Sequence, residues 1–112
     1  MLRYLISFDD GWMKISDEDL PAVDAATRAV VREAKAAGVW IFGGGILGQQ
    51  AGIVAPDGTL SAGPWPETKP VIGGFSIVEV ASRDDAMQWA AKFAASCRCA
   101  QEVREIMFDP ES

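Results

Sequence analysis

The sequence predicts an α+β fold of the ferredoxin-like type, with the order βαββαβ and a central hairpin. Short runs rich in aliphatic and aromatic residues stand near both ends and in the middle of the chain, as strands require. Two longer stretches repeat their apolar residues at helical spacing, so two helices cross between the strands. At 112 residues the chain is predicted to form a single domain over residues 1–112.

The first half of the chain supplies a strand, a helix and a second strand. The first strand is predicted over 2–8 and ends at the turn residues 9–11. Ser16, which three acidic residues follow, is the predicted N-cap of a helix that ends at Gly38. A second strand over 39–42 then runs into three consecutive glycines.

The second half predicts two more strands, a helix and a final strand. A strand over 51–55 is followed by a Pro-Asp-Gly turn, and residues 74–80 alternate between apolar and polar side chains. Ser82 with Asp85 caps the second helix, and the final strand contains Val103, Ile106, Met107 and Phe108. Both predicted helices cover one face of the sheet, so the other face, which also carries apolar side chains, is left uncovered. That face predicts a homodimer that buries sheet against sheet.

Composition excludes several classes of function. The net charge of −6 argues against a nucleic-acid partner and against an anionic membrane surface. No apolar run approaches the length of a spanning helix, and the N-terminus lacks a signal-peptide cleavage site, so a cytoplasmic protein is expected. Histidine is absent, and Cys97 and Cys99 are too few for a closed zinc site. We therefore predict no metal and no cofactor.

The segment 62–69 is the strongest candidate for a site. Its two prolines make it stiff, so it holds Trp65, Glu67 and Lys69 in a fixed arrangement beside Gly73-Gly74. Two interpretations stay open with equal weight: these side chains brace the loop, or they contact a ligand. Catalysis by Glu67 is the weakest interpretation, because a carboxylate base needs a pKa raised by burial.

The glycine run 43–45 lacks the spacing of a phosphate-binding loop, and no helix is predicted directly after it. Close approach of the backbone or a bend in the strand explains these glycines better. Gly43 and Gly44 still suit the floor of a cleft, since glycine lets a ligand approach the chain.

The loop and the element order resemble the YCII-related family, in particular its DGPF-type branch. The matching residues are Ala62 through Lys69 and the pair Gly73-Gly74, with further likeness at 36–39 and 102–106. The resemblance implies a dimeric α+β barrel with a cleft near the motif. Some members carry a His-Asp pair proposed for acid-base chemistry, and a few are linked to elimination from chlorinated aromatics. Here Ala62 replaces the first aspartate of the motif, and there is no histidine for the pair.

The leading functional hypothesis is a dimeric, non-catalytic or weakly catalytic domain that binds a small molecule beside the 63–69 loop, with an anionic molecule as one option. The first strand contributes to this pocket, and the other predicted ligand-binding residues are Gly43, Gly44, Pro64, Trp65, Glu67, Thr68 and Lys69. One alternative is a lyase or acid-base enzyme that uses Glu67 or Asp9 in place of histidine. Another is a regulatory interaction module associated with a transcription factor.

Overall fold

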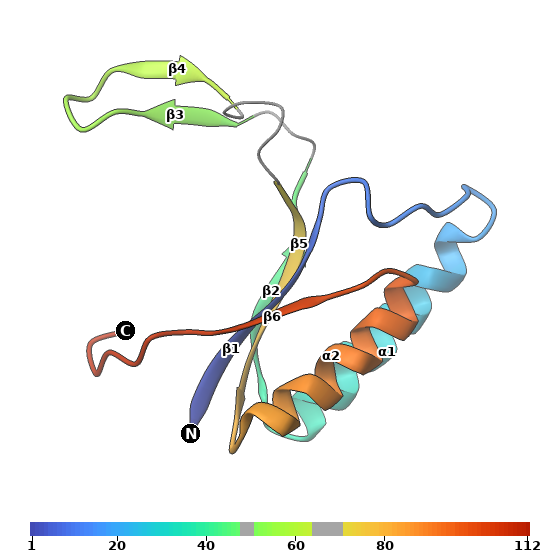
Figure 1. Ribbon diagram of the computed structural model, residues 1–112. Helices are drawn as coiled ribbons and strands as arrows, with labels where there is room; N and C mark the ends of the chain where they lie inside the picture. The colour runs from blue at the N-terminus through green and yellow to red at the C-terminus, as the bar shows by residue number, and fades with distance from the viewer. Residues whose placement is uncertain (48–50, 64–70) are drawn as a thin grey trace.

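The computed structural model describes residues 1–47, 51–63 and 71–112. Figure 1 shows two helices packed side by side on one face of a sheet, with a hairpin projecting from one end of the molecule. The elements are β1 (Leu2–Asp9), α1 (Leu20–Ala36), β2 (Trp40–Gly45), β3 (Gly52–Val54), β4 (Leu60–Ala62), β5 (Ile72–Val80), α2 (Arg83–Cys97) and β6 (Glu102–Glu105).

The main sheet has the strand order β2-β5-β1-β6, and each neighbouring pair is antiparallel. The two strands that begin and end the chain thus lie next to each other, with β5 between β1 and β2. This is the ferredoxin-like arrangement, so the predicted fold class is confirmed. Across the described ranges, no helix combines the length and apolar character needed to cross a bilayer.

The core lies between the sheet and the helices. Alternate residues of the two central strands face the helices, with Tyr4 opposite Val78 and Leu2 opposite Val80. Tyr4, Ile6 and Val78 are at most 1% exposed and pack against Ala90 and other small or aromatic residues of α2. Burial and the hydrogen bond that the Tyr4 hydroxyl donates to the Glu105 carboxylate (3.0 Å) raise the pKa of Tyr4.

The helix ends follow the predicted capping residues in part. The Ser82 hydroxyl accepts a hydrogen bond from the Asp85 amide at 3.2 Å and caps α2 as predicted. Ser16 makes the same kind of contact with the Asp19 amide, but α1 begins only at Leu20. Ser16 therefore stabilises a turn that leads into the helix. Gly38 closes α1 with a φ of +76°, which a residue with a side chain adopts only under strain.

Strands β3 and β4 form a hairpin of their own, outside the main sheet. The strand predicted over 51–55 is present as β3, and it pairs with β4 while β5 pairs with β2. In the turn between β3 and β4, the Asp57 carboxylate accepts a hydrogen bond from the Thr59 amide at 2.9 Å. Hydrogen bonding from Thr59 lowers the pKa of Asp57.

The final strand is shorter than predicted. β6 ends at Glu105, and Ile106 only donates its amide to the Arg3 carbonyl at 2.8 Å. Met107 and Phe108 are 89% and 83% exposed. The prediction that these three residues belong to the strand was wrong, because β1 begins at Leu2 and has almost no chain left to pair with them.

Both helices lie on one face of the sheet, and no described helix covers the other face (Figure 1). Apolar side chains lie on that other face. Leu5, Phe75 and Ile77 are half-buried there, and Phe42 is 63% exposed. The Phe42 and Phe75 rings lie against each other with centroids 6.0 Å apart. We call these four residues the open face. An uncovered apolar face is what the sequence predicts for the protomer, while the homodimer itself stays a prediction.

Candidate functional site

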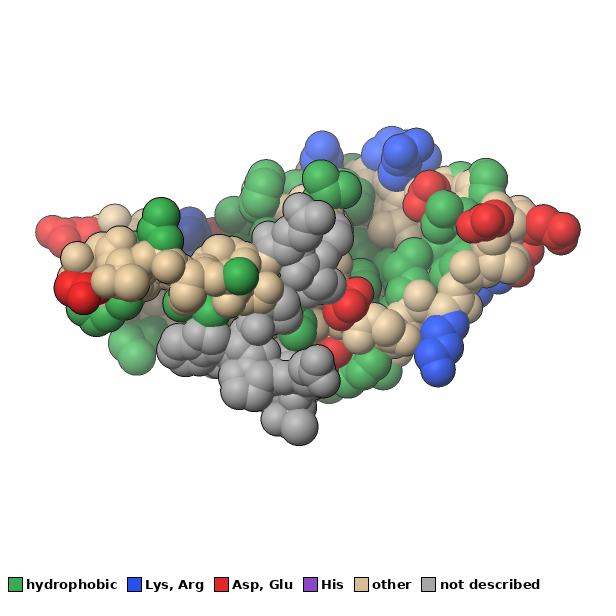
Figure 2. All heavy atoms as spheres, turned by 90° about the horizontal axis from the view of Figure 1, so that it is seen from above, with side chains coloured by type: hydrophobic (Ala, Val, Ile, Leu, Met, Phe, Trp, Pro, Cys, Tyr) green, Lys and Arg blue, Asp and Glu red, His purple; other side chains and the backbone are tan. Residues whose placement is uncertain are grey.

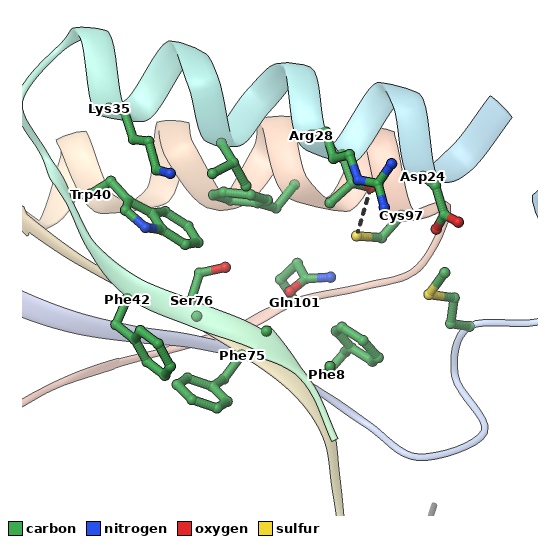
Figure 3. A pocket seen from close by; sticks show the side chains of 17 residues that line it. Phe8, Asp24, Arg28, Lys35, Trp40, Phe42, Phe75, Ser76, Cys97 and Gln101 are labelled. Carbon is green, nitrogen blue, oxygen red and sulfur yellow. Dashed lines mark hydrogen bonds between the residues drawn. The ribbon is translucent and has the colours of Figure 1, made fainter. Parts of the chain in front are cut away.

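A cavity of about 680 Å³ lies between the helical layer and the glycine-rich part of β2. Figure 3 shows α1 and α2 on one side of it and the strands on the other. Figure 2, seen from above, shows a hollow floored by hydrophobic side chains. The volume falls within the range of roughly 300–1,000 Å³ that small-molecule pockets occupy.

The cavity exists because the strands beneath α1 carry small residues. β2 contributes Gly43 to Gly45, and β5 contributes Ser76 opposite Gly43. A Cβ at Gly43 lies 2.5 Å from the Phe75 carbonyl oxygen and 2.9 Å from Cη2 of Trp40. No side chain fits at that position, so close approach of the backbone explains this glycine, as the sequence indicates.

Aromatic rings form much of the wall. Trp40 of β2 and Phe93 of α2 lie with ring centroids 6.1 Å apart, and Phe8 of β1 completes the wall at the end of the sheet. The Phe8 ring rests on Gly74, where a Cβ is placed only 2.5 Å from its Cζ. The second glycine of the Gly73-Gly74 pair therefore makes room for a side chain of the cavity wall.

Polar side chains enter the cavity from both layers. Figure 3 shows Ser76 and Gln101 pointing into it from the sheet side. From the helices come Thr27 and Cys97, whose Oγ1 and Sγ atoms are 3.5 Å apart. Both cysteines are free thiols, and burial raises the pKa of the neighbouring Cys99.

A row of residues on α1 brings charge to the cavity. Asp24, Arg28, Val31 and Lys35 follow one another at spacings of four, three and four residues, which places them on one side of the helix. Lys35 lies beside Trp40, while Asp24 and Arg28 lie at the opposite end (Figure 3). Among the described residues, neither Arg28 nor Lys35 forms an ion pair.

The predicted site residues fall into three groups. Gly43 and Gly44 line the cavity, and Phe8 of the first strand lines it with them. Asp9 ends β1, half-buried and outside the cavity lining, and its carbonyl accepts the Trp12 amide at 3.1 Å. The remaining predicted residues lie outside the described residues: Pro64, Trp65, Glu67, Thr68 and Lys69.

Sequence reasoning missed the row of charged residues on α1. The signal was present as the spacing of Asp24, Arg28 and Lys35, which run alongside the core-facing residues Val23 and Thr27. In residues 1–47, 51–63 and 71–112, no three histidine, cysteine, aspartate or glutamate side chains lie close enough together to hold a metal ion.

The sequence profile of the YCII-related domain matches residues 3–107. The chain belongs to the YCII-related family. A search of curated protein sequences found no match. Among solved structures, this YCII-related protein is similar to 5-chloro-2-hydroxyhydroquinone dehydrochlorinase (TftG) from Burkholderia phenoliruptrix AC1100, in complex with 2,5-dihydroxybenzoquinone. The TM-score is 0.55 at 20% identity, over 99% of this chain and 98% of that one, so the likeness shows a shared fold.

Proposed function

We propose that this YCII-related protein binds a small organic anion with a flat ring in the cavity beneath α1. The observation that carries the proposal is the pair of cations, Arg28 and Lys35, that border an aromatic cavity without an ion-pair partner among the described residues. Trp40 offers a ring face, with Phe93 packed against it, and charge-assisted hydrogen bonds from the cations suit an anionic group.

Local charge matters in a protein as acidic as this one. With a net charge of −6, the molecule as a whole repels anions, so an anionic ligand needs a local excess of positive charge. Four other cations are already paired with carboxylates, as Arg98 is with Asp19 at 3.1 Å. Within the described part of the chain, Arg28 and Lys35 are therefore the cavity-lining cations of α1 that remain available to a ligand.

Binding without an assigned reaction is the function that the described geometry favours. Acid-base catalysis by a carboxylate needs a group that burial keeps partly protonated near neutral pH. Among the described residues, the carboxylate that lines the cavity is that of Asp24, and Asp24 is exposed to solvent. The solved relative is named as a dehydrochlorinase and holds a ring compound, which supports a ring-shaped ligand here.

Filling the cavity tests the proposal. Gly45 lies opposite Gly74 on the cavity side of β2, and a Cβ at Gly45 meets no atom within 4 Å. Gly45→Val therefore places methyl groups in the cavity without a clash. We expect aromatic carboxylates to bind at least about tenfold more weakly, because bound ring and valine compete for the same volume. Isothermal titration calorimetry measures this loss.

A glycine outside the cavity lining provides the matched control. Gly52 begins β3, and a Cβ there also meets nothing within 4 Å. Gly52→Val adds the same volume away from the cavity and should leave the affinity within about twofold of wild type. Equal affinity in the Gly45 variant, or no binding of aromatic carboxylates to the wild type, contradicts the proposal.

We also infer a homodimer formed through the open face. Leu5, Phe42, Phe75 and Ile77 form a contiguous apolar surface, and the YCII resemblance implies sheet-to-sheet pairing. Ile77→Glu puts a carboxylate at its centre and should convert the dimer to monomers in analytical ultracentrifugation, because the charge loses its hydration on association. Met87→Glu, at a 47% exposed site on α2, should leave the dimer intact. A monomeric wild type, or a dimeric Ile77 variant, contradicts the inference.

A further inference from the structure

We propose that the ligand of the cavity carries two anionic groups, one at each end, which Lys35 and Arg28 bind. This inference rests on the proposed function, because it specifies the class of anion that the same cavity takes. A ligand of this class is an elongated aromatic diacid. It differs from a monoanion in requiring both cations at once.

Helix geometry separates the two cations along the cavity. Seven residues on an α-helix correspond to an axial distance of about 10.5 Å and bring the second residue back to almost the same side. Arg28 and Lys35 have this spacing, and both line the cavity. Figure 3 shows them at its two ends, so a single compact anionic group does not contact both.

The surface between the cations is suited to the body of such a ligand. Val31 lies between them on α1, and Trp40 borders the same space, with the buried Phe93 ring packed against it. Ser76 and Gln101 are the polar groups that point into the cavity from the sheet side (Figure 3). A ring system with a hydroxyl or carbonyl group near its middle matches this pattern of apolar and polar contacts.

Asp24 limits the ligand at one end. It lies one helical turn before Arg28, on the side away from Lys35, and it also lines the cavity. An anionic group that extends past Arg28 meets this carboxylate and is repelled. The row of Asp24, Arg28 and Lys35 therefore favours a diacid whose length matches the separation of the two cations.

Matched acids test the inference on the wild-type protein. The probes are biphenyl dicarboxylate with its acids at opposite ends, biphenyl monocarboxylate, and terephthalate as a short diacid. By calorimetry we expect the long diacid to bind about tenfold more tightly than the other two, because only it reaches both cations. Equal affinities of the long diacid and the monoacid overturn the inference, and they leave the proposed binding of an anion intact.

Charge-removing variants locate the two anionic groups. Arg28→Gln and Lys35→Gln should each lower the affinity for the long diacid by about tenfold. The affinity for the monoacid should fall only about twofold in either variant, since its carboxylate can bind the remaining cation. Arg32→Gln is the control: it removes the same charge from the same helix at an exposed residue outside the cavity lining. We expect no change in that variant.

The double variant distinguishes the two-ended ligand from the anion site on which it rests. In R28Q/K35Q both acids should lose most of their binding. If one single variant binds the long diacid like wild type, the two-ended ligand is wrong. If the double variant binds both acids like wild type, the proposed anion site beneath α1 is wrong as well. Thermal unfolding of each variant checks that the fold persists.

Discussion

Gly43→Ala is expected to destabilise the protein by about 3 kcal/mol, at the upper end of the usual cost of overpacking. The alanine Cβ would stand 2.5 Å from the Phe75 carbonyl oxygen and 2.9 Å from the Ser76 Cα. Both are backbone atoms of β5, which pairs with β2 on one side and β1 on the other. They cannot move away unless the ladder between two strands opens. The free energy of unfolding, measured in urea, gives the size of the effect.

Gly44→Ala is the matched control in the same strand. A Cβ at Gly44 meets no atom within 4 Å, and its φ is not in the left-handed region. We expect a change within about 0.5 kcal/mol, or slight stabilisation, because alanine restricts the unfolded chain more than glycine does. Similar stabilities of the two variants would contradict the close approach of β2 and β5 at Gly43.

Phe93→Ala is expected to destabilise the protein by about 4 kcal/mol, as large truncations in a core commonly do. The Phe93 side chain is only 3% exposed and belongs to the cluster that joins α2 to the sheet. Its ring also packs against Trp40 and lines the cavity. The truncation therefore removes buried apolar area and merges new empty volume with the existing cavity, so little relaxation of neighbouring groups offsets the loss.

Phe93→Leu separates packing from the aromatic contact. Leucine retains most of the buried area, so its cost should be about 1–2 kcal/mol, well below that of alanine. The leucine variant should also bind aromatic carboxylates more weakly, by a larger free energy than its loss of stability, because the aromatic contact with Trp40 is lost. A Phe93→Ala variant as stable as wild type would show that Phe93 lies outside the core.

The fold was predictable because its elements carry local signals. Residues 74–80 alternate between apolar and polar side chains except at Ile77-Val78 and form most of β5, one of the two central strands. Ser82 with Asp85 places the start of α2 correctly. The residues at which two paired strands end were not predictable in this way. Whether Ile106 and Met107 extend a strand depends on how far β1 reaches beside them, which is a property of two segments distant in sequence.

The candidate site was predictable to a smaller extent. Gly43 and Gly44 suit the floor of a cleft because glycine lets a ligand approach the chain, and both line the cavity, while ligand binding by them stays a prediction. Arg28 and Lys35 were missed because a helix has charged rows on both sides of its apolar stripe. The sequence alone does not tell which row borders a cavity, since that depends on how α1 lies over β2.

The β3–β4 hairpin contacts no other helix or strand within the described ranges. It has three residues in each strand and exposes Val54 and Leu60, so its own hydrogen bonds contribute little stability in the isolated protomer. Its amide protons should therefore exchange with solvent through local opening, at rates that do not report on the global unfolding of the sheet and helices. A protease that cuts at Pro56–Gly58 would correspondingly leave the main sheet and both helices folded.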